Sequence, residues 1–234
     1  MQQFLESKVA SLFPLYLAVP FTTLSELSSL AKTHPRCFIG AQNMHEATKG
    51  AYTGEISGAM LREAGASFVL LGHSERRQLF GESEQSIAAK LSRAVAEKLS
   101  PILCIGETLE ENEKGEREEI LRRQLLGSLA NQKVQALSSL IVAYEPVWAI
   151  GSGKVPKEEE VEQIHTFCYS LLSEWGGEEW AENIPILYGG SVTKENAAGF
   201  LRQSHVNGLL VGTASLEIEH LTEILSIAKE FVAP

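Results

Sequence analysis

Short apolar runs alternate with longer amphipathic stretches along most of the chain. Each apolar run is nearly continuous and ends at Gly, Pro or a polar residue, which is typical of a strand covered on both faces in a parallel sheet. Seven such runs predict strands: LYLAV (15–19), CFIGA (37–41), FVLLG (68–72), PILCIG (101–106), SLIVAY (139–144), IPILYG (184–189) and VNGLLVG (206–212).

The stretches between the predicted strands have helical periodicity and are rich in Ala, Leu, Glu and Lys. They predict helices at 57–66, 83–99, 116–132 and 157–175, and a further amphipathic helix at 1–13 with no strand before it. Strands and helices that alternate at this spacing form right-handed βαβ units, either in an open doubly wound sheet or in a closed (β/α)8 barrel. No linker-like composition divides the chain, so we expect a single domain over residues 1–234.

The composition excludes several classes of partner and site. The formal net charge is -10, whereas a nucleic-acid backbone or an anionic membrane needs a basic face, so neither is an expected partner. Cys37, Cys104 and Cys168 lack CxxC spacing, so neither a disulfide framework nor a zinc site is expected. The apolar stretch near the start is too short for a membrane span and is interrupted by proline. We therefore expect a cytoplasmic protein without a metal.

Polar residues that can carry chemistry follow four of the predicted strands. They are His73, Glu145, Ser191, and the pair Gly212 and Thr213. If all strands are parallel, these groups converge on one rim of the sheet. A His and a Glu aimed at a shared space can polarise a carbonyl and remove a neighbouring proton, while Gly-rich turns offer backbone N–H groups to an anion. This combination indicates an aldose–ketose isomerase acting on a sugar phosphate.

Seven motifs, in order and in spacing, make the chain resemble the triosephosphate isomerase family. They are AQN (41–43), GAYTGEIS (50–57), LGHSERR (71–77), CIGE (104–107), AYEPVWAIGSGK (143–154), YGGSV (188–192) and LLVGTASL (209–216). The resemblance extends from the first predicted helix to the C-terminus. It implies an α/β fold, the (β/α)8 TIM barrel, here with the first β-strand missing from the chain.

The resemblance also implies the roles of individual residues. Glu145 would take a proton from dihydroxyacetone phosphate to give an enediolate, and reprotonation at the other carbon would give D-glyceraldehyde 3-phosphate. His73 would be the uncharged electrophile that donates a hydrogen bond to the carbonyl oxygens. The stretch PVWAIGSGKVP (146–156) would be a lid that closes over the substrate. No cofactor is implied. The residues expected to hold the phosphate are Gly151, Ser191, Gly212 and Thr213.

In the family, the loop that corresponds to GAYTGE reaches into the site of a neighbouring subunit. Thr53 and Glu55 would do so here, which implies a homodimer. Two features depart from the family: Thr213 stands where Gly is usual, and no strand with the usual Asn and Lys precedes the first helix. We expect the native protein to begin before Met1, and we expect weak or absent isomerase activity if the chain is complete as written.

Two other functions are compatible with these patterns. One is a non-catalytic phosphometabolite-binding or interaction protein on a degenerate barrel, which would bind a phosphate analogue without isomerising a substrate. The other is a different barrel enzyme for sugar phosphates, such as an epimerase, which a panel of substrates would distinguish. The match over the whole predicted lid favours the isomerase.

Overall fold

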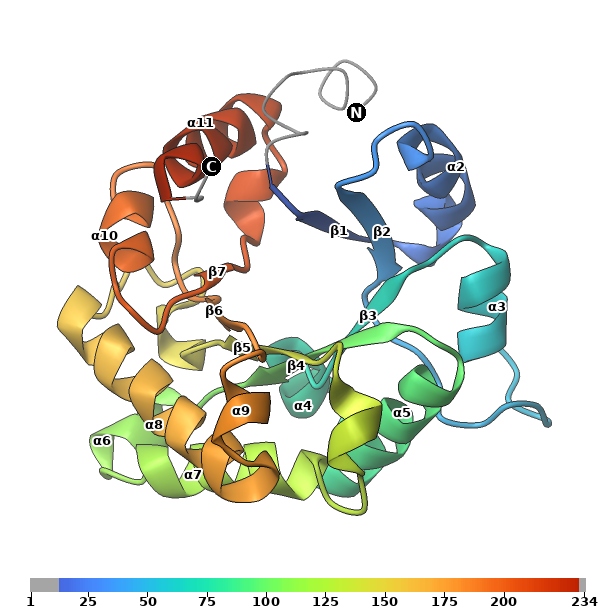
Figure 1. Cartoon of the computed structure of the whole chain (residues 1–234), viewed down its shortest axis with the longest axis horizontal. Coiled ribbons are helices and arrows are strands. Elements are labelled where there is room, and N and C mark those ends of the chain that lie inside the picture. The colour runs from blue at the N-terminus through green and yellow to red at the C-terminus, as the bar shows by residue number, and fades with distance from the viewer. Residues whose placement is uncertain (1–12, 232–234) are drawn as a thin grey trace.

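The computed structural model describes residues 13–231 and contains one parallel sheet whose seven strands follow one another in chain order. The sheet is curled, with helices around its outside (Figure 1). Its strands are β1 (Leu15–Val19), β2 (Cys37–Ala41), β3 (Phe68–Leu71), β4 (Ser100–Ile105), β5 (Ile141–Tyr144), β6 (Ile186–Tyr188) and β7 (Gly208–Leu209). The prediction of seven strands in a TIM-barrel-like α/β fold is therefore confirmed.

The connections between the strands are mainly helical. The longer helices are α2 (Phe21–Ala31), α5 (Glu84–Ala96), α7 (Arg117–Ser128), α8 (Glu158–Gly176) and α11 (Ile218–Ala228). Shorter elements complete the connections: α3 (Gly58–Glu63), α4 (Ser74–Leu79), α6 (Leu109–Glu113), α9 (Glu178–Ala181), α10 (Ala197–Leu201) and the 3-10 helices η2 (Val134–Leu137), η3 (Val147–Ala149), η4 (Thr213–Ser215) and η5 (Lys229–Phe231). Sequence signals explain several helix starts. For example, Ser83 and Ser86 form a capping box at the start of α5.

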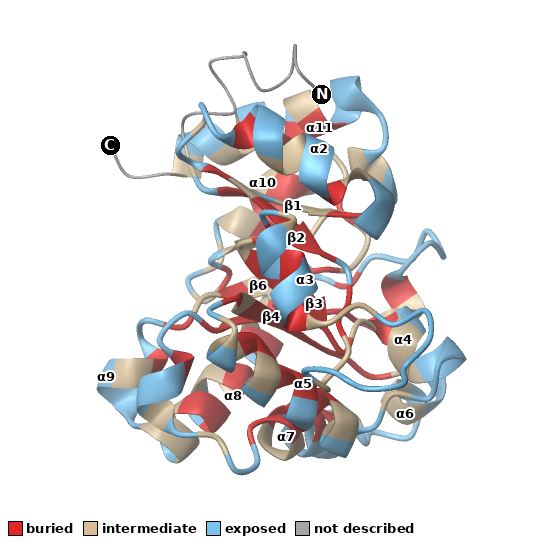
Figure 2. Cartoon of the chain, turned by 90° about the vertical axis from the view of Figure 1, so that its right-hand side faces the viewer, coloured by how far each residue is buried: buried red, intermediate tan, exposed pale blue. Residues whose placement is uncertain are grey.

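Burial on both faces explains why the strands are continuously apolar. Alternate side chains point to opposite faces of a strand, so Phe68 and Leu70 pack inside the curled sheet while Val69 and Leu71 pack under the helices. The inner cluster contains strand residues only, whereas the outer cluster includes residues of α5, α7 and α8. Figure 2 shows the buried residues concentrated in the sheet and on the inward helix faces.

Within residues 13–231 the sheet does not close on itself, because β1 and β7 each pair on one side only. At this gap Tyr16 stacks on Phe38 with ring centroids 4.8 Å apart, and its side chain is 39% exposed. The ladder between β6 and β7 spans only Gly208 and Leu209, so β7 is shorter than the predicted strand at 206–212. A strand with a partner on one side only has fewer hydrogen bonds to define its length. The predicted helix at 1–13 lies almost wholly outside the described residues.

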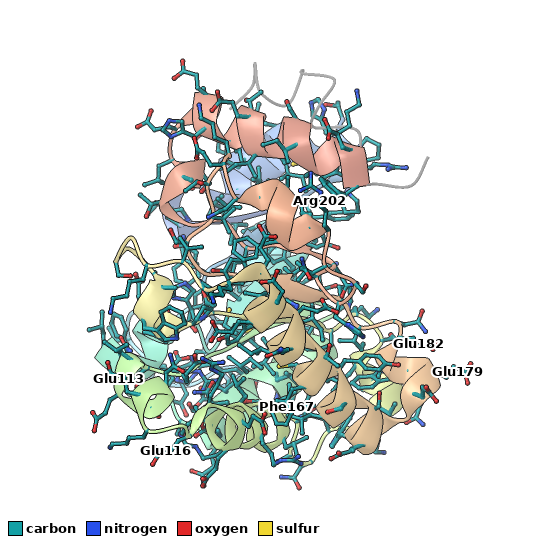
Figure 3. The ribbon with its side chains drawn as sticks, turned by 90° about the vertical axis from the view of Figure 1, so that its left-hand side faces the viewer. Glu113, Glu116, Phe167, Glu179, Glu182 and Arg202 are labelled. Carbon is teal, nitrogen blue, oxygen red and sulfur yellow. The ribbon has the colours of Figure 1, made fainter. Side chains whose placement is uncertain are left out.

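Several of the glutamates that give the chain its net charge of -10 lie on the outer surface. Figure 3 shows Glu113, Glu116, Glu179 and Glu182 directed away from the body of the molecule. Within the described part of the chain, no helix combines the length and the apolar character that crossing a membrane requires.

One titratable side chain is enclosed between α8 and the sheet. His165 is fully buried, its ring lies edge-on to that of Tyr144, and its Nδ1 lies 3.0 Å from the carbonyl oxygen of His205. That carbonyl can only accept, so Nδ1 carries the proton and donates. Burial lowers the pKa of His165 from 6.5 to about 4, although the carbonyl of His205 and the charge of Glu162 oppose this shift. The imidazole is therefore neutral in the folded protein near pH 7.

We predict that His165 makes the protein less stable in mild acid. The unfolded chain binds a proton at this residue near pH 6.5, whereas the folded protein does so only near pH 4, so stability falls as the pH drops between these values. The loss from this group is on the order of 3 kcal/mol. Urea titrations at several pH values should show a shallower acid slope for His165→Gln. An unchanged slope would contradict the assignment. The stability difference at pH 8, where the imidazole is neutral, measures the changes in packing and in the hydrogen bond to His205.

Candidate active site

His73 lies at the carboxyl end of β3, where it caps the N-terminus of α4. Its Nδ1 accepts a hydrogen bond from the backbone N–H of Glu75 at 3.4 Å. Because an imidazole nitrogen that accepts carries no hydrogen, the proton of the neutral ring is on Nε2. Nε2 lies 3.1 Å from Oε1 of Glu145 and donates to it. The capped turn thus fixes the Nε2–H tautomer of His73 and directs this N–H group across the rim towards Glu145.

Glu145 is the first residue after β5, and its side chain is almost completely buried. Its backbone N–H donates to the carbonyl of Ile105 at 2.7 Å, which extends the pairing of β5 with β4 by one residue. Its Oε2 accepts the backbone N–H of Ser74 at 3.2 Å, while Oε1 faces His73. The structure therefore brings together the two residues that the sequence analysis placed at separate strand ends.

The pKa of His73 reflects two opposed influences. Burial lowers it, whereas the hydrogen bond and the negative charge of Glu145 raise it, and the net result is a pKa above the ordinary value of 6.5. Beneath the pair, burial raises the pKa of Cys104 well above its usual range, and the neighbouring charge of Glu145 adds to this effect. Cys104 is thus a neutral thiol and not a nucleophile.

Two glycines make room for Glu145. A Cβ at Gly106 would lie 1.8 Å from the carbonyl oxygen of Glu145, and a Cβ at Gly189 would lie 3.0 Å from its Cγ. Neither position tolerates a larger residue without displacing the carboxylate or its main chain. The sequence analysis did not assign these glycines to the site. Their signal is a Gly directly after an apolar run, in CIGE and in YGG.

The segment predicted to be a lid begins directly after Glu145. Its first turn is η3, in which Val147 N–H donates to the carbonyl of Glu107 at 3.0 Å. Trp148 Nε1 donates to the side-chain oxygen Oε1 of Glu107 at 2.8 Å. Gly151 and Gly153 follow at the tip, exposed and with positive φ angles of 63° and 75°. The segment is therefore anchored at its start and lies open to solvent at its tip.

Glu107 holds the start of this segment from a completely buried position. Its Oε1 also accepts the hydroxyl of Tyr144 at 3.1 Å and lies 3.3 Å from Nε of Arg117. Burial raises the pKa of Glu107, while the donors around it, Trp148 first, lower it and offset part of the shift. The sequence analysis missed this role, because Glu107 and Trp148 are far apart in the chain and only the fold brings them together.

The residues predicted to hold a phosphate follow β6 and β7. Ser191 is half-buried, and its carbonyl accepts a hydrogen bond from Asn196 Nδ2 at 2.9 Å. Gly212 precedes η4, which begins at Thr213, and both residues are exposed. The first amides of a helical turn have no acceptor within that turn, so these N–H groups are available to an anion. Gly151 is on the open segment described above.

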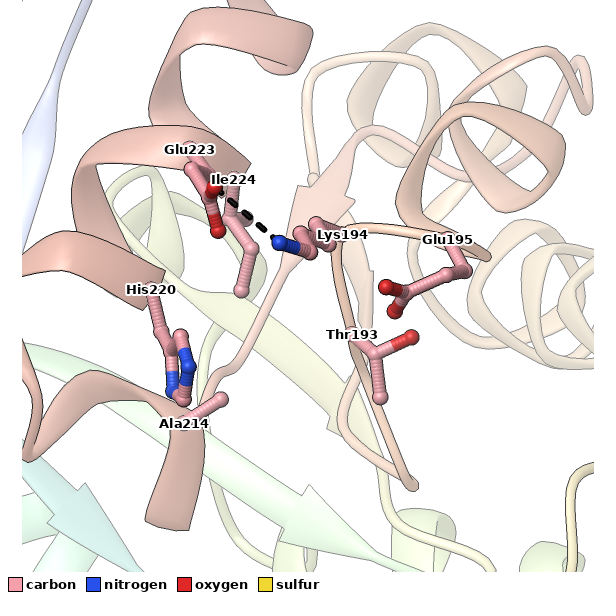
Figure 4. Close-up of a pocket in the computed structure, with 7 residues that line it drawn as sticks. All are labelled: Thr193, Lys194, Glu195, Ala214, His220, Glu223 and Ile224. Carbon is pink, nitrogen blue, oxygen red and sulfur yellow. Dashed lines mark hydrogen bonds and ion pairs between the residues drawn. The ribbon is translucent and has the colours of Figure 1, made fainter.

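A surface pocket of about 190 Å³ lies beside these loops, between the segment after β6 and α11 (Figure 4). Thr193, Ala214 and His220 contribute to its wall, and Lys194 forms an ion pair with Glu223 at 3.0 Å. Because neither His73 nor Glu145 lines it, this pocket does not identify the reacting centre. Among the described residues, no group of three or more His, Cys, Asp or Glu side chains could hold a metal ion.

Comparisons with known proteins point to one family. A family model described as triosephosphate isomerase matches residues 1–228. A triosephosphate isomerase of Protochlamydia amoebophila is 48% identical over 211 residues, which are 90% of this chain and 80% of the relative. One from Alkaliphilus oremlandii is 42% identical over 208 residues, or 88% of this chain and 83% of the relative.

A solved structure gives the same result. The crystal structure of triosephosphate isomerase from Bartonella henselae has a TM-score of 0.86 and is 37% identical to this chain. The alignment covers 97% of this chain and 91% of the other. Sequence and structure therefore agree, and the chain belongs to the triosephosphate isomerase family.

Proposed function

We propose that this protein is a triosephosphate isomerase that interconverts dihydroxyacetone phosphate and D-glyceraldehyde 3-phosphate in glycolysis and gluconeogenesis. The observation that carries the proposal is the 3.1 Å contact between His73 Nε2 and Glu145 Oε1 at the rim where the loops after β6 and β7 also lie. An N–H donor and a carboxylate base in one small space are the two groups that enolisation of a carbonyl compound requires.

Glu145 is the proposed base. Its carboxylate removes a proton from the carbon beside the carbonyl, and the electrons move to the carbonyl oxygen to form an enediolate. The same side chain returns the proton to the neighbouring carbon, and the hydroxyl proton of the enediolate moves from the oxygen on the first carbon to the oxygen on the second, so that the carbonyl changes carbon. A Cβ at Gly189 would lie 3.0 Å from Cγ of Glu145, so this glycine leaves the carboxylate room to turn from His73 to the substrate, whereas Gly106 makes room for the main chain of Glu145.

His73 is the proposed electrophile. With Nδ1 occupied by the N–H of Glu75, its Nε2–H can donate to the carbonyl oxygen of the substrate once that oxygen takes the place of Glu145 Oε1. A donor that is already oriented stabilises the developing negative charge without reorganisation. The role requires a neutral imidazole, which the hydrogen bond to Nδ1 favours.

Gly151, Ser191, Gly212 and Thr213 are the proposed phosphate-binding residues. Their N–H groups belong to turns that follow strands β5, β6 and β7, so a phosphate bound there holds the triose against the rim. Closure of the segment after Glu145 would bring Gly151 to the phosphate and exclude water, which protects the enediolate from loss of phosphate. The side chain of Thr213 narrows this space compared with the Gly that is usual in the family.

A homodimer in the cytoplasm completes the proposal. Thr53 and Glu55 are exposed on the loop between β2 and α3, which projects from the body of the molecule beside α3 (Figure 1). Large apolar side chains are exposed on this loop, on α3 and around α4, at Tyr52, Met60, Leu79 and Phe80. Such side chains are commonly covered by a partner. The three cysteines are free, which suits a reducing compartment.

A coupled assay for triose phosphate isomerisation tests the function directly. Turnover in both directions, with no conversion of other sugar phosphates, is expected. Binding of a phosphate analogue without turnover would instead indicate a non-catalytic binding protein, for which the family relationship gives no support.

We predict that Glu145→Asp lowers kcat by about 10²-fold and changes KM by much less. The shorter side chain retracts the base by one methylene, and a displacement of roughly 1 Å can cost this much when reacting atoms must be aligned. Steady-state kinetics provide the measurement, with Glu179→Asp on the exposed surface of α9 as the matched control. Equal losses in affinity and turnover would show that Glu145 is not the base.

We predict that Leu79→Glu dissociates the protein into monomers. Leu79 is 74% exposed in the single chain, and a carboxylate placed in a covered apolar contact would be desolvated without a partner. Sedimentation should give a mass twice that of the 25.6 kDa chain for the wild type and one chain for the variant. Leu216→Glu, at a position 80% exposed beyond β7, serves as the control and should remain dimeric. A monomeric wild type would refute the proposed assembly.

A further inference from the structure

Gln124 makes two hydrogen bonds from α7 to a single residue at the end of β4. Its side chain is only 6% exposed. The backbone N–H of Gly106 donates to Gln124 Oε1 at 2.8 Å, and Gln124 Nε2 donates to the carbonyl oxygen of Gly106 at 3.0 Å. The side-chain amide therefore pairs with both polar groups of Gly106, as the main chain of a neighbouring strand would.

Gly106 needs such a partner because it lies just beyond the sheet ladder. The pairing of β4 with β5 ends at Ile105 and Tyr144. Gly106 also lies against the main chain of the proposed base, since a Cβ at this position would be 1.8 Å from the carbonyl oxygen of Glu145. A shift of Gly106 therefore displaces Glu145.

The residues on both sides of Gly106 hold the base and the start of the lid. The carbonyl of Ile105 accepts the N–H of Glu145 at 2.7 Å, and the carbonyl of Glu107 accepts the N–H of Val147 at 3.0 Å. Gln124 binds the peptide groups between these two acceptors. The two hydrogen bonds of Gln124 thus orient a turn of three residues. The backbone carbonyls of this turn accept hydrogen bonds from Glu145 and from the first turn of the lid.

We propose that Gln124 is a positioning residue for Glu145, acting through the turn of Ile105, Gly106 and Glu107. It does not touch the substrate, and its contribution is to keep the carboxylate at the correct reach while the lid opens and closes. This inference rests on the proposed function for its effect on turnover, whereas its effect on the turn is independent of any activity.

Gln124→Met tests the inference, because methionine keeps the length and volume but forms neither hydrogen bond. We expect kcat to fall on the order of 10- to 100-fold, as for a misplaced catalytic group, with KM within about threefold of the wild type. Hydrogen exchange followed by mass spectrometry should show faster exchange at residues 104–107 and 145–149. Gln132→Met is the matched control. Like Gln124, Gln132 donates a hydrogen bond from its side-chain amide to a main-chain carbonyl, that of Ala88 in α5, but it lies away from the rim.

Gln124→Glu provides a second variant with a readout that simple loss of stability would not reproduce. Both hydrogen bonds can form when this carboxyl is protonated, but its ionised form cannot donate to the carbonyl of Gly106. The kcat ratio of the Glu to the Met variant should therefore rise as the pH falls from 8 to 6. Glu107, Glu145 and Cys104, with Arg117 and Arg77 beside them, are present in both variants, so the pH dependence that they have in the Met variant divides out and the ratio reports the new carboxyl together with its charge effect on these neighbours.

The outcomes separate this inference from the proposed function. A wild type without isomerase activity would refute the function, and the exchange measurement would still decide whether Gln124 holds the turn. Unchanged kcat and unchanged exchange in Gln124→Met, or a ratio independent of pH, would overturn the inference. So would an equal loss of activity in Gln132→Met.

Discussion

The burial of one carboxylate, that of Glu145, is the constraint on which the arrangement of the rim depends. This residue is 2% exposed, and an ionised carboxylate in such a place costs several kcal/mol unless hydrogen bonds compensate it. The compensating donors are Nε2 of His73 and the backbone N–H of Ser74. Both follow β3, whereas Glu145 follows β5, so the interaction is possible only if β3, β4 and β5 keep their register.

The same region combines a fixed main chain with a movable side chain. The main chain of Glu145 is bound to Ile105 and packed on Gly106, and Gln124 holds Gly106 from outside the sheet. The carboxylate itself is bordered by Gly189, which has no side chain to restrict it. A base that must accept a proton at one carbon and return it to another needs this combination, because its anchor must stay still while its oxygens move.

Much of this fold could be predicted from the sequence because its strands are buried on both faces. The runs at 15–19 and 37–41 match β1 and β2 residue for residue, and the longest predicted helices correspond to α5, α7 and α8. The predicted and observed strands differ most at 206–212. There β7 has one neighbouring strand, and its short pairing with β6, rather than the apolar run, sets its ends. His73 and Glu145 could be identified because polar residues after apolar runs are conspicuous and the strands are parallel.

The residues that support the site could not be found in this way. Gln124 lies at helical spacing from Ile120, Leu121 and Ser128, which places it on the inward face of α7. The spacing does not show what its amide binds, because Gly106 reaches it only when α7 packs against the end of β4. Glu107 is likewise an ordinary residue at a strand end until Trp148 and Tyr144 converge on it. Such roles depend on contacts between distant segments, which no local pattern records.

The protonation state of His73 follows from the movement of Glu145. While the carboxylate accepts from Nε2, its charge raises the pKa of the imidazole above the ordinary value. A second proton would have to bind at Nδ1, which accepts the backbone N–H of Glu75 at 3.4 Å, although the carboxylate of Glu75 also lies 4.0 Å from this nitrogen. When the carboxylate turns towards a substrate, the largest influence that raises the pKa of His73 weakens, whereas burial and the charge of Arg76, which lower the pKa, remain and are opposed by the smaller influence of Glu75. The ring is therefore driven towards its neutral form at the step in which a neutral donor is required.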